Sequence, residues 1–510
     1  ASSARLTRAI ELFEQGDNKG ANAVLNFDEI SAEMQQNACR IDQARQLEQQ
    51  ALGALQSNIE ECKLKVKTIR AEKPEGWLQE CTKIYDTAIE QARGRIPNED
   101  FAELLFDEAL LLAENYQFLR AEEVFEEIKE IYRDLSKKNP DAFLADLALT
   151  IGNLAILHND IEQYEEAQKE IEEILNIYCV LSEKSPDAYL SKVAWAVREL
   201  AWLHNCIGQY EESERGFEES LSIYLDLSEQ NPSAFLHDVA LTVGRQAILH
   251  KRIGQYKRAE LEYKKSLNIY RLLSEESPDA YLSEIARTLG NLASLHKEIG
   301  QFGEAEREYE ESLSVYRDLS EKSPDSFLPK VAGIVGGMAG LHRDIGQYEK
   351  AERGYEESLS IYRNLSARSQ DAYLSKVVGV VGNLANLHYC IGRYEKAERE
   401  NEECLSIYRD LSEKCPGAYM SKVALTVGNL ASLHSLLGQY KKAQGEFEES
   451  LTIFRGLSEK SPNAYLPDVA RTVGNLANLH WDIGCYEESE RGYEESQSIY
   501  RDLAEKNPDV

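Results

Sequence analysis

Histidine is the residue type whose spacing most suggests chemistry in this 510-residue sequence, because eight of the nine histidines recur every 46 residues. Imidazole can bind a metal ion or transfer a proton near neutral pH. A constant interval of this size indicates one structural unit repeated in tandem, as in a solenoid. A residue that recurs in every unit is expected to have a structural role. Functional residues are therefore expected at the positions where the copies differ. The eight positions are His158, His204, His250, His296, His342, His388, His434 and His480.

The spacing argues against a metal or catalytic site shared between histidines. Equivalent positions in adjacent repeats are separated by two helix layers of about 8–10 Å each, whereas zinc needs its ligands at about 2 Å. Leu112 occupies the same position in the first, divergent unit, which indicates that the position accepts an apolar side chain. We therefore expect the histidines to pack inside the protein, with no metal and no cofactor.

No familiar catalytic motif is present in the sequence. It contains no phosphate-binding G-x-x-x-x-G-K segment, no G-x-S-x-G nucleophile and no H-E-x-x-H zinc motif. The nine cysteines are odd in number and form no C-x-x-C pair, which favours a reducing, cytoplasmic location over a disulfide framework. Paired glutamates such as Glu211 and Glu212 are expected to lie on a solvated helix face. The sequence thus predicts a protein that is not an enzyme.

The net charge of −32 excludes two classes of partner. A nucleic-acid binder needs a basic face to neutralise phosphates, and an anionic membrane surface repels an acidic protein. No apolar run approaches 18 residues and no signal-peptide pattern is visible, so we expect no membrane-spanning segment.

Two helices in each repeat would position the recurring residues. In the copy from Pro416 to Ser461, proline occupies the first helical position, and the preceding residue, Cys415 here but Ser or Asn in most copies, is expected to cap the helix. Gly438 is expected to end this helix in the left-handed conformation. A second helix is expected to begin at Tyr440.

The stretch GNLASLHSLLGQYKKAQGEFEESLTIF resembles a tetratricopeptide repeat of the kinesin-light-chain type. The resemblance implies an all-α, right-handed solenoid of helical hairpins. The period of 46 residues exceeds the usual value of about 34, so the helices or their connection must be longer. Similar long arrays occur in bacterial proteins whose repeats carry a separate effector domain. The matching positions are Leu430, Ala431, Gly438, Tyr440, Ala443 and Phe447.

The repeats are expected to fill residues 94–510. Residues 1–93 form a separate helical region, in which apolar residues from Phe27 to Ile69 predict a long helix with an apolar seam, broken at 73–76. That helix either packs along the array or dimerises as a coiled coil. Residues after 506 begin a tenth copy, so we expect a fragment or an end that meets a partner. The nine repeats are about 94–139, 140–185, 186–231, 232–277, 278–323, 324–369, 370–415, 416–461 and 462–507.

The kinesin-light-chain resemblance implies a peptide-binding role for the asparagine that precedes the Leu-Ala pair. An amide both donates and accepts, which suits the backbone of an extended peptide. Glu199, Arg245 and Gly337 interrupt the series, and a role for asparagine within the array is the alternative. The asparagines are Asn153, Asn291, Asn383, Asn429 and Asn475.

The positions around each histidine vary most between copies and include residue types that anchor interfaces. The repeat at 232–277 is also unusually basic, so it is expected to attract an acidic segment, unless acidic neighbours neutralise it. With Arg245, the candidate binding residues are Trp202, Lys251, Arg252, Arg343, Tyr389 and Trp481.

The sequence therefore predicts a non-catalytic scaffold that holds a peptide or protein partner in the concave groove. The alternative is the sensor or regulatory arm of a bacterial defence or signalling effector, of the protease, TIR or nuclease type, whose catalytic domain lies elsewhere. Oligomerisation through the N-terminal helix is a further possibility.

Overall fold

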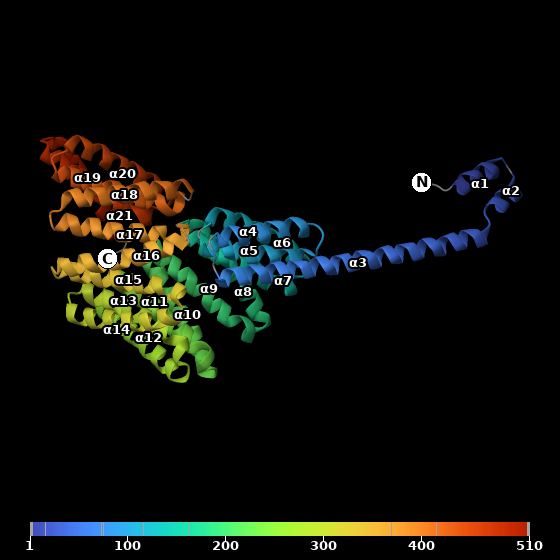
Figure 1. Ribbon diagram of the computed structural model, residues 1–510, viewed down its shortest axis with the longest axis horizontal. Helices are drawn as coiled ribbons and strands as arrows, with labels where there is room; N and C mark the ends of the chain where they lie inside the picture. The colour runs from blue at the N-terminus through green and yellow to red at the C-terminus, as the bar shows by residue number, and fades with distance from the viewer. Residues whose placement is uncertain are drawn as a thin grey trace. The chain divides into compact units, whose positions relative to one another are not determined.

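The computed structural model confirms an all-α repeat solenoid, with helices and no strand in the residues it describes (Figure 1). The described residues are 4–15, 17–72, 74, 76–115, 117–161, 163–368, 370–414 and 416–506. Cys415, residues 73 and 75 of the predicted helix break, and the predicted tenth copy from 507 onward lie outside them. Contacts divide the chain into two units, Ala1–Leu105 and Phe106–Val510.

The first unit contains the long helix predicted from the apolar seam. Its helices are α1 (Ala4–Glu14), α2 (Asn18–Val24), α3 (Phe27–Glu72) and α4 (Trp77–Ala92), followed by the start of α5. The last part of α3 packs against α4 and buries Val66 and Ile69, whereas Met34 and Ile41 in its first part are exposed. Dimerisation through this exposed part stays a prediction.

The second unit is a series of helical pairs, and every helix from α7 onward has 21 residues. The first helix of each pair packs against the second, and the second packs against the first helix of the next pair. The unit boundary falls inside α5 (Asn98–Glu114), which α6 (Phe118–Lys138) follows. The pairs are α7 (Pro140–Asp160) with α8 (Tyr164–Lys184), α9 (Pro186–Cys206) with α10 (Tyr210–Gln230), α11 (Pro232–Arg252) with α12 (Tyr256–Glu276), α13 (Pro278–Glu298) with α14 (Phe302–Lys322), α15 (Pro324–Asp344) with α16 (Tyr348–Arg368), α17 (Gln370–Cys390) with α18 (Tyr394–Lys414), α19 (Pro416–Leu436) with α20 (Tyr440–Lys460), and α21 (Pro462–Asp482) with α22 (Tyr486–Lys506).

The period of 46 residues is made of two long helices and two short connections. Three residues join the two helices of a pair, and a single residue joins one pair to the next. Gly438 has a φ of 74° and Tyr440 begins α20, as predicted. The long period thus comes from longer helices.

The single-residue junction is built differently from the predicted helix cap. Ser185 stands at the N-cap of α9, but its side chain makes no capping hydrogen bond, and the same holds for Asn231, Ser277, Ser323 and Ser461. Instead, the backbone N–H of Ser185 donates to the Leu181 carbonyl at the end of α8. One residue therefore ends one helix and starts the next, and the prediction of side-chain capping is wrong.

One helix, α7, is long and apolar enough to cross a membrane by length and composition alone. The expectation that no apolar run approaches this length is therefore wrong. In the structure α7 is the first helix of its pair and packs between α6 and α8, with Leu154 and Ala155 buried, as a core helix does.

A recurring side-chain hydrogen bond joins the two helices within a pair. The Ser312 hydroxyl donates to the Ala286 carbonyl over 2.7 Å, and five equivalent serines do the same over 2.7–2.8 Å. In the pair α17–α18 a cysteine takes this place, with 3.5 Å between Cys404 Sγ and the Val378 oxygen.

We expect Cys404 to resist alkylation in the folded protein. Burial raises the pKa of its thiol from 9.0 to about 12, which lowers the reactive thiolate fraction by about a thousandfold at neutral pH. Cys390 is exposed and should react readily. Mass spectrometry after timed iodoacetamide labelling measures both rates, and the two should converge in urea. Equal rates in the native protein would contradict the buried position.

Candidate functional site

The recurring histidines lie near the ends of the first helices, where most make hydrogen bonds to glutamates. In the pair α17–α18, His388 is 2 % exposed and its Nδ1 lies 2.7 Å from a carboxylate oxygen of Glu400 on α18. The corresponding distances are 2.7 Å for His158–Glu170, 2.5 Å for His250–Glu262, 2.7 Å for His296–Glu308 and 2.6 Å for His434–Glu446.

A second glutamate, from the preceding repeat, approaches the other ring nitrogen. His388 Nε2 lies 3.1 Å from Glu352 on α16. Both carboxylates can accept a hydrogen bond from this ring only when both nitrogens carry a proton. The same arrangement involves His158 with Glu122, His250 with Glu214, His296 with Glu260, His342 with Glu306 and His434 with Glu398, at 3.1–3.6 Å.

Five of these histidines therefore join three helices of two repeats, whereas His342 joins only α15 and α14, because Gly354 takes the place of the glutamate on α16. The buried position predicted from the sequence is confirmed for these histidines, whereas their glutamate partners were not predicted. Each partner recurs at a fixed offset, 12 residues after or 36 residues before a histidine. That offset was a usable signal in the sequence. No group of three or more metal-binding side chains occurs among the described residues.

The histidines differ in their surroundings and so in their pKa values. Burial by itself lowers the pKa of His158, but the hydrogen bonds and charges of Glu170 and Glu122 outweigh it, so the pKa lies above its usual 6.5. Around His204, Gln168 and Gly216 take the places of the two glutamates. Burial therefore lowers the pKa of His204 below 6.5.

The predicted asparagine series lies on the first helices but does not form a uniform row. Asn153 donates to the Leu149 carbonyl of its own helix over 2.9 Å, which is the alternative role. Asn291 lines a cavity described below. Asn383 is exposed, and Asn429 and Asn475 are partly buried.

Trp202 and Arg245 meet in a cavity of about 430 Å³ lined by α7, α9 and α11. The Arg245 guanidinium lies over the Trp202 ring, 5.4 Å from its centre, and 2.8 Å from a carboxylate oxygen of Glu199. Glu199 and Arg245 occupy the asparagine position of consecutive repeats. Sequence variation at this position thus creates a charged, aromatic pocket on the face of the first helices.

The basic repeat at 232–277 is largely neutralised by its neighbours. Lys251 lies 3.0 Å from Glu298, and Arg252 donates to the Asn205 carbonyl over 2.6 Å. Arg258, Lys264 and Arg271 also form ion pairs, with Glu214, Glu260 and Glu311. These cations are engaged within the array, so the structure gives no support to an acidic segment docked on this repeat.

The remaining candidates lie at the ends of their first helices and do not converge with Trp202. Arg343 pairs with the adjacent Asp344 at 2.8 Å. Tyr389 and Trp481 are exposed and contact the first residues of the following helices, Tyr394 and Tyr486, with ring centres 6.0 and 5.0 Å apart.

A second cavity on the first helices, of about 630 Å³, was missed by the sequence analysis. It lies along α13, α15 and α17 and is lined by Asn291, Lys330, Gly333, Tyr373 and Lys376, among others. The predicted binding residues lie near each histidine, whereas these lysines lie near the other end of the helices.

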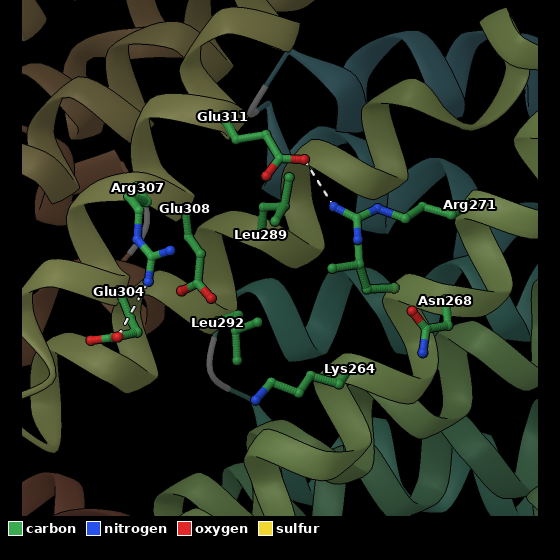
Figure 2. Close-up of a pocket in the computed structure, with 10 residues that line it drawn as sticks. Lys264, Asn268, Arg271, Leu289, Leu292, Glu304, Arg307, Glu308 and Glu311 are labelled. Carbon is green, nitrogen blue, oxygen red and sulfur yellow. Dashed lines mark hydrogen bonds and ion pairs between the residues drawn. The ribbon is translucent and has the colours of Figure 1, made fainter.

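A third cavity, of about 400 Å³, lies between the second helices α12 and α14 (Figure 2). Its charges are paired: Arg271 lies 2.9 Å from Glu311, and Arg307 lies 3.2 Å from Glu304, as the dashed lines mark. The Arg271–Glu311 pair recurs between five other pairs of successive second helices. This outer face is therefore occupied by contacts that hold the repeats together.

Two family models match parts of the sequence. The tetratricopeptide repeat model matches residues 285–325 and 381–413. The model of anaphase-promoting complex subunit 5 matches residues 106–179, 418–466 and 470–507. No curated protein matches the sequence.

Several solved structures are similar in fold. BtubC (BKLC) from P. vanneervenii is 25% identical, with 49% of this chain and 92% of that chain covered and a TM-score of 0.40. A Rap protein in complex with competence and sporulation factor is 16% identical, with 81% and 100% covered and a TM-score of 0.43. A putative kinesin light chain from Podosopora anserina is 18% identical, with 44% and 98% covered and a TM-score of 0.33.

These TM-scores are too low to indicate a shared activity. The two segments that match the repeat model lie in α13–α14 and α17–α18, and the same helical pair recurs on both sides of them. The chain therefore contains tetratricopeptide repeats in these two segments, within a longer array of similar helical pairs.

Proposed function

We propose that this protein is a non-catalytic scaffold that binds an extended segment of a partner protein along the face formed by its first helices. The observation that carries this proposal is that shared residues and variable residues have different positions and contacts in the array. Side chains shared by the repeats, such as the histidines and their glutamates, are used to join helices. Side chains that vary line two cavities on the first helices.

The Trp202 cavity offers groups suited to a peptide. Trp202 supplies an aromatic surface, and Glu199 and Arg245 supply an acceptor and donors beside it. Aromatic and arginine side chains that are partly buried in a pocket are the types that dominate binding energy at protein interfaces.

Peptide binding to full-length variants tests the proposal. We expect Trp202→Ala to weaken binding of a fluorescein-labelled degenerate peptide pool by about tenfold, a typical loss at an interface anchor. Arg409→Ala is the matched control, because it removes an exposed ion pair with Glu449 between second helices. Fluorescence anisotropy measures both. Equal affinities for wild type and Trp202→Ala would contradict the groove.

The sensor-arm alternative predicted from the sequence is compatible with the same groove. It requires a catalytic domain in the same reading frame or on a stable partner. Sequencing the complete reading frame and its genomic neighbours tests this point, and the absence of any protease, TIR or nuclease domain there would contradict it.

A further inference from the structure

A cavity whose described charged side chains are all basic is unusual in a protein whose net charge is −32. The cavity along α13, α15 and α17 is lined by Arg287, Lys330 and Lys376, and its lining includes no aspartate or glutamate among the side chains that the structure describes. Arg287 is already paired with Glu284, at 2.5 Å. The two lysines are exposed and form no ion pair with any described side chain. The cavity thus presents about two uncompensated positive charges.

The same helix position carries an acid in several other repeats and lysine, Lys192, in α9. Among the described residues Asp146 at this position has no ion pair, whereas the other acids are paired. Asp238, Glu284 and Asp468 occupy the position of Lys330 in their own first helices, and each is paired with an arginine. The lysines at this position in three consecutive repeats are Lys330, Lys376 and Lys422. A run of unpaired cations here, in place of paired acids, indicates a ligand of negative charge.

Glycine makes room for such a ligand beside the lysines. Gly333 and Gly337 lie three and seven residues after Lys330, on the same face of α15, and both line the cavity. A Cβ at Gly337 would lie 3.1 Å from the ring of Tyr309, so a larger residue would crowd that wall. Gly333 therefore leaves space beside Lys330, whereas at Gly337 the Tyr309 ring occupies the place that a side chain would take and forms a wall of the cavity.

We propose that this cavity, here called the lysine pocket, binds the phosphate of a phosphorylated side chain in a partner segment. A phosphate monoester carries about −1.5 to −2 charges and three acceptor oxygens, which matches two lysines on neighbouring helices. A carboxylate would supply only one charge. Lysine binds phosphate as a point charge and needs no fixed bidentate geometry. This proposal rests on the proposed function and names the chemistry that its partner carries.

Three fluorescein-labelled degenerate peptide pools test the lysine pocket on the full-length protein. The pools differ only in a central phosphoserine, serine or glutamate. We expect the phosphoserine pool to bind about tenfold more tightly than the serine pool, as two charge-assisted contacts allow, and more tightly than the glutamate pool. Inorganic phosphate should compete with the phosphoserine pool and leave the serine pool bound.

Charge-reversed variants identify the pocket responsible. Lys330→Glu combined with Lys376→Glu should abolish the preference for phosphoserine. Lys192→Glu is the matched control, because Lys192 is exposed at the same helix position in α9, between repeats that carry Asp146 and Asp238 there. A preference that survives the double variant would overturn the lysine pocket.

The outcomes separate this inference from the proposed function. Equal binding of the phosphoserine and glutamate pools would overturn the preference for phosphate. Equal binding of all three pools, still weakened by Trp202→Ala, would overturn the lysine pocket and leave the groove intact. Binding of no pool would contradict the groove and the lysine pocket together.

Discussion

Replacing His388 with leucine is expected to destabilise the pair α17–α18 by about 2 kcal/mol, because the Glu400 carboxylate loses its hydrogen-bond partner on α17. Glu352 keeps its ion pairs with Arg393 and Lys396. His388 is buried between Glu400 and Glu352, whose side chains are about one-fifth exposed. Leucine fits the site sterically, since Leu112 is fully buried at the equivalent position of α5. The loss would therefore come from charge and hydrogen bonding.

His204→Leu is the matched control, since Gln168 and Gly216 replace the two glutamates around His204. We expect it to change stability by less than about 1 kcal/mol, because no buried carboxylate loses a partner. Amide hydrogen exchange resolved by helix is the suitable measurement, because a long repeat array does not unfold in one step. Equal effects of the two substitutions on stability would show that the hydrogen bonds between His388 and the two glutamates contribute nothing to the stability of the pair.

The pH dependence of stability is expected to have opposite signs at His158 and His204. The pKa of His158 is raised in the folded state, so the protonated ring stabilises the fold below pH 6.5, and this contribution is lost as the pH rises through the raised pKa. The pKa of His204 is lowered, so its contribution is present above pH 6.5 and is lost as the pH falls through 6.5 toward the lowered value.

Leucine variants isolate these two contributions. The destabilisation caused by His158→Leu should be largest below pH 6.5 and shrink at higher pH. His204→Leu should gain stability relative to the wild type only as the pH falls below 6.5. Hydrogen exchange in α7 and α9, corrected for the intrinsic effect of pH, measures both. The same sign at both histidines would contradict the assigned surroundings.

Much of the fold was predictable because the residues that mark the helix ends recur in each repeat. Gly438 and Tyr440 mark the end of one helix and the start of the next, and both predictions are confirmed. The predicted serine caps are wrong because a one-residue junction leaves the side chain no capping geometry. The capping preference of serine applies to an isolated helix end. At this junction the packing of two consecutive helices determines the backbone conformation of the serine instead.

The candidate site was less predictable because its chemistry depends on which helices meet. His388 is adjacent in space to Glu352, 36 residues earlier, and only the stacking of α16 against α17 brings them together. Likewise, the sequence shows that residues 232–277 are basic but not that Glu298 and Glu311 of the next repeat pair with Lys251 and Arg271. Periodicity gives the position of a residue within a repeat, and the neighbouring repeat decides what that residue contacts.

The single-residue junction between helical pairs also limits how the gene can change. An α-helix turns by about 100° per residue, so one inserted or deleted residue at Ser185 would rotate every later repeat away from the contacts it makes. Removal or duplication of a whole 46-residue unit preserves each junction and presents each second helix with the kind of first helix it already contacts. The array therefore tolerates a change in length when recombination between copies adds or removes whole units. Related proteins are expected to differ in length by whole repeats.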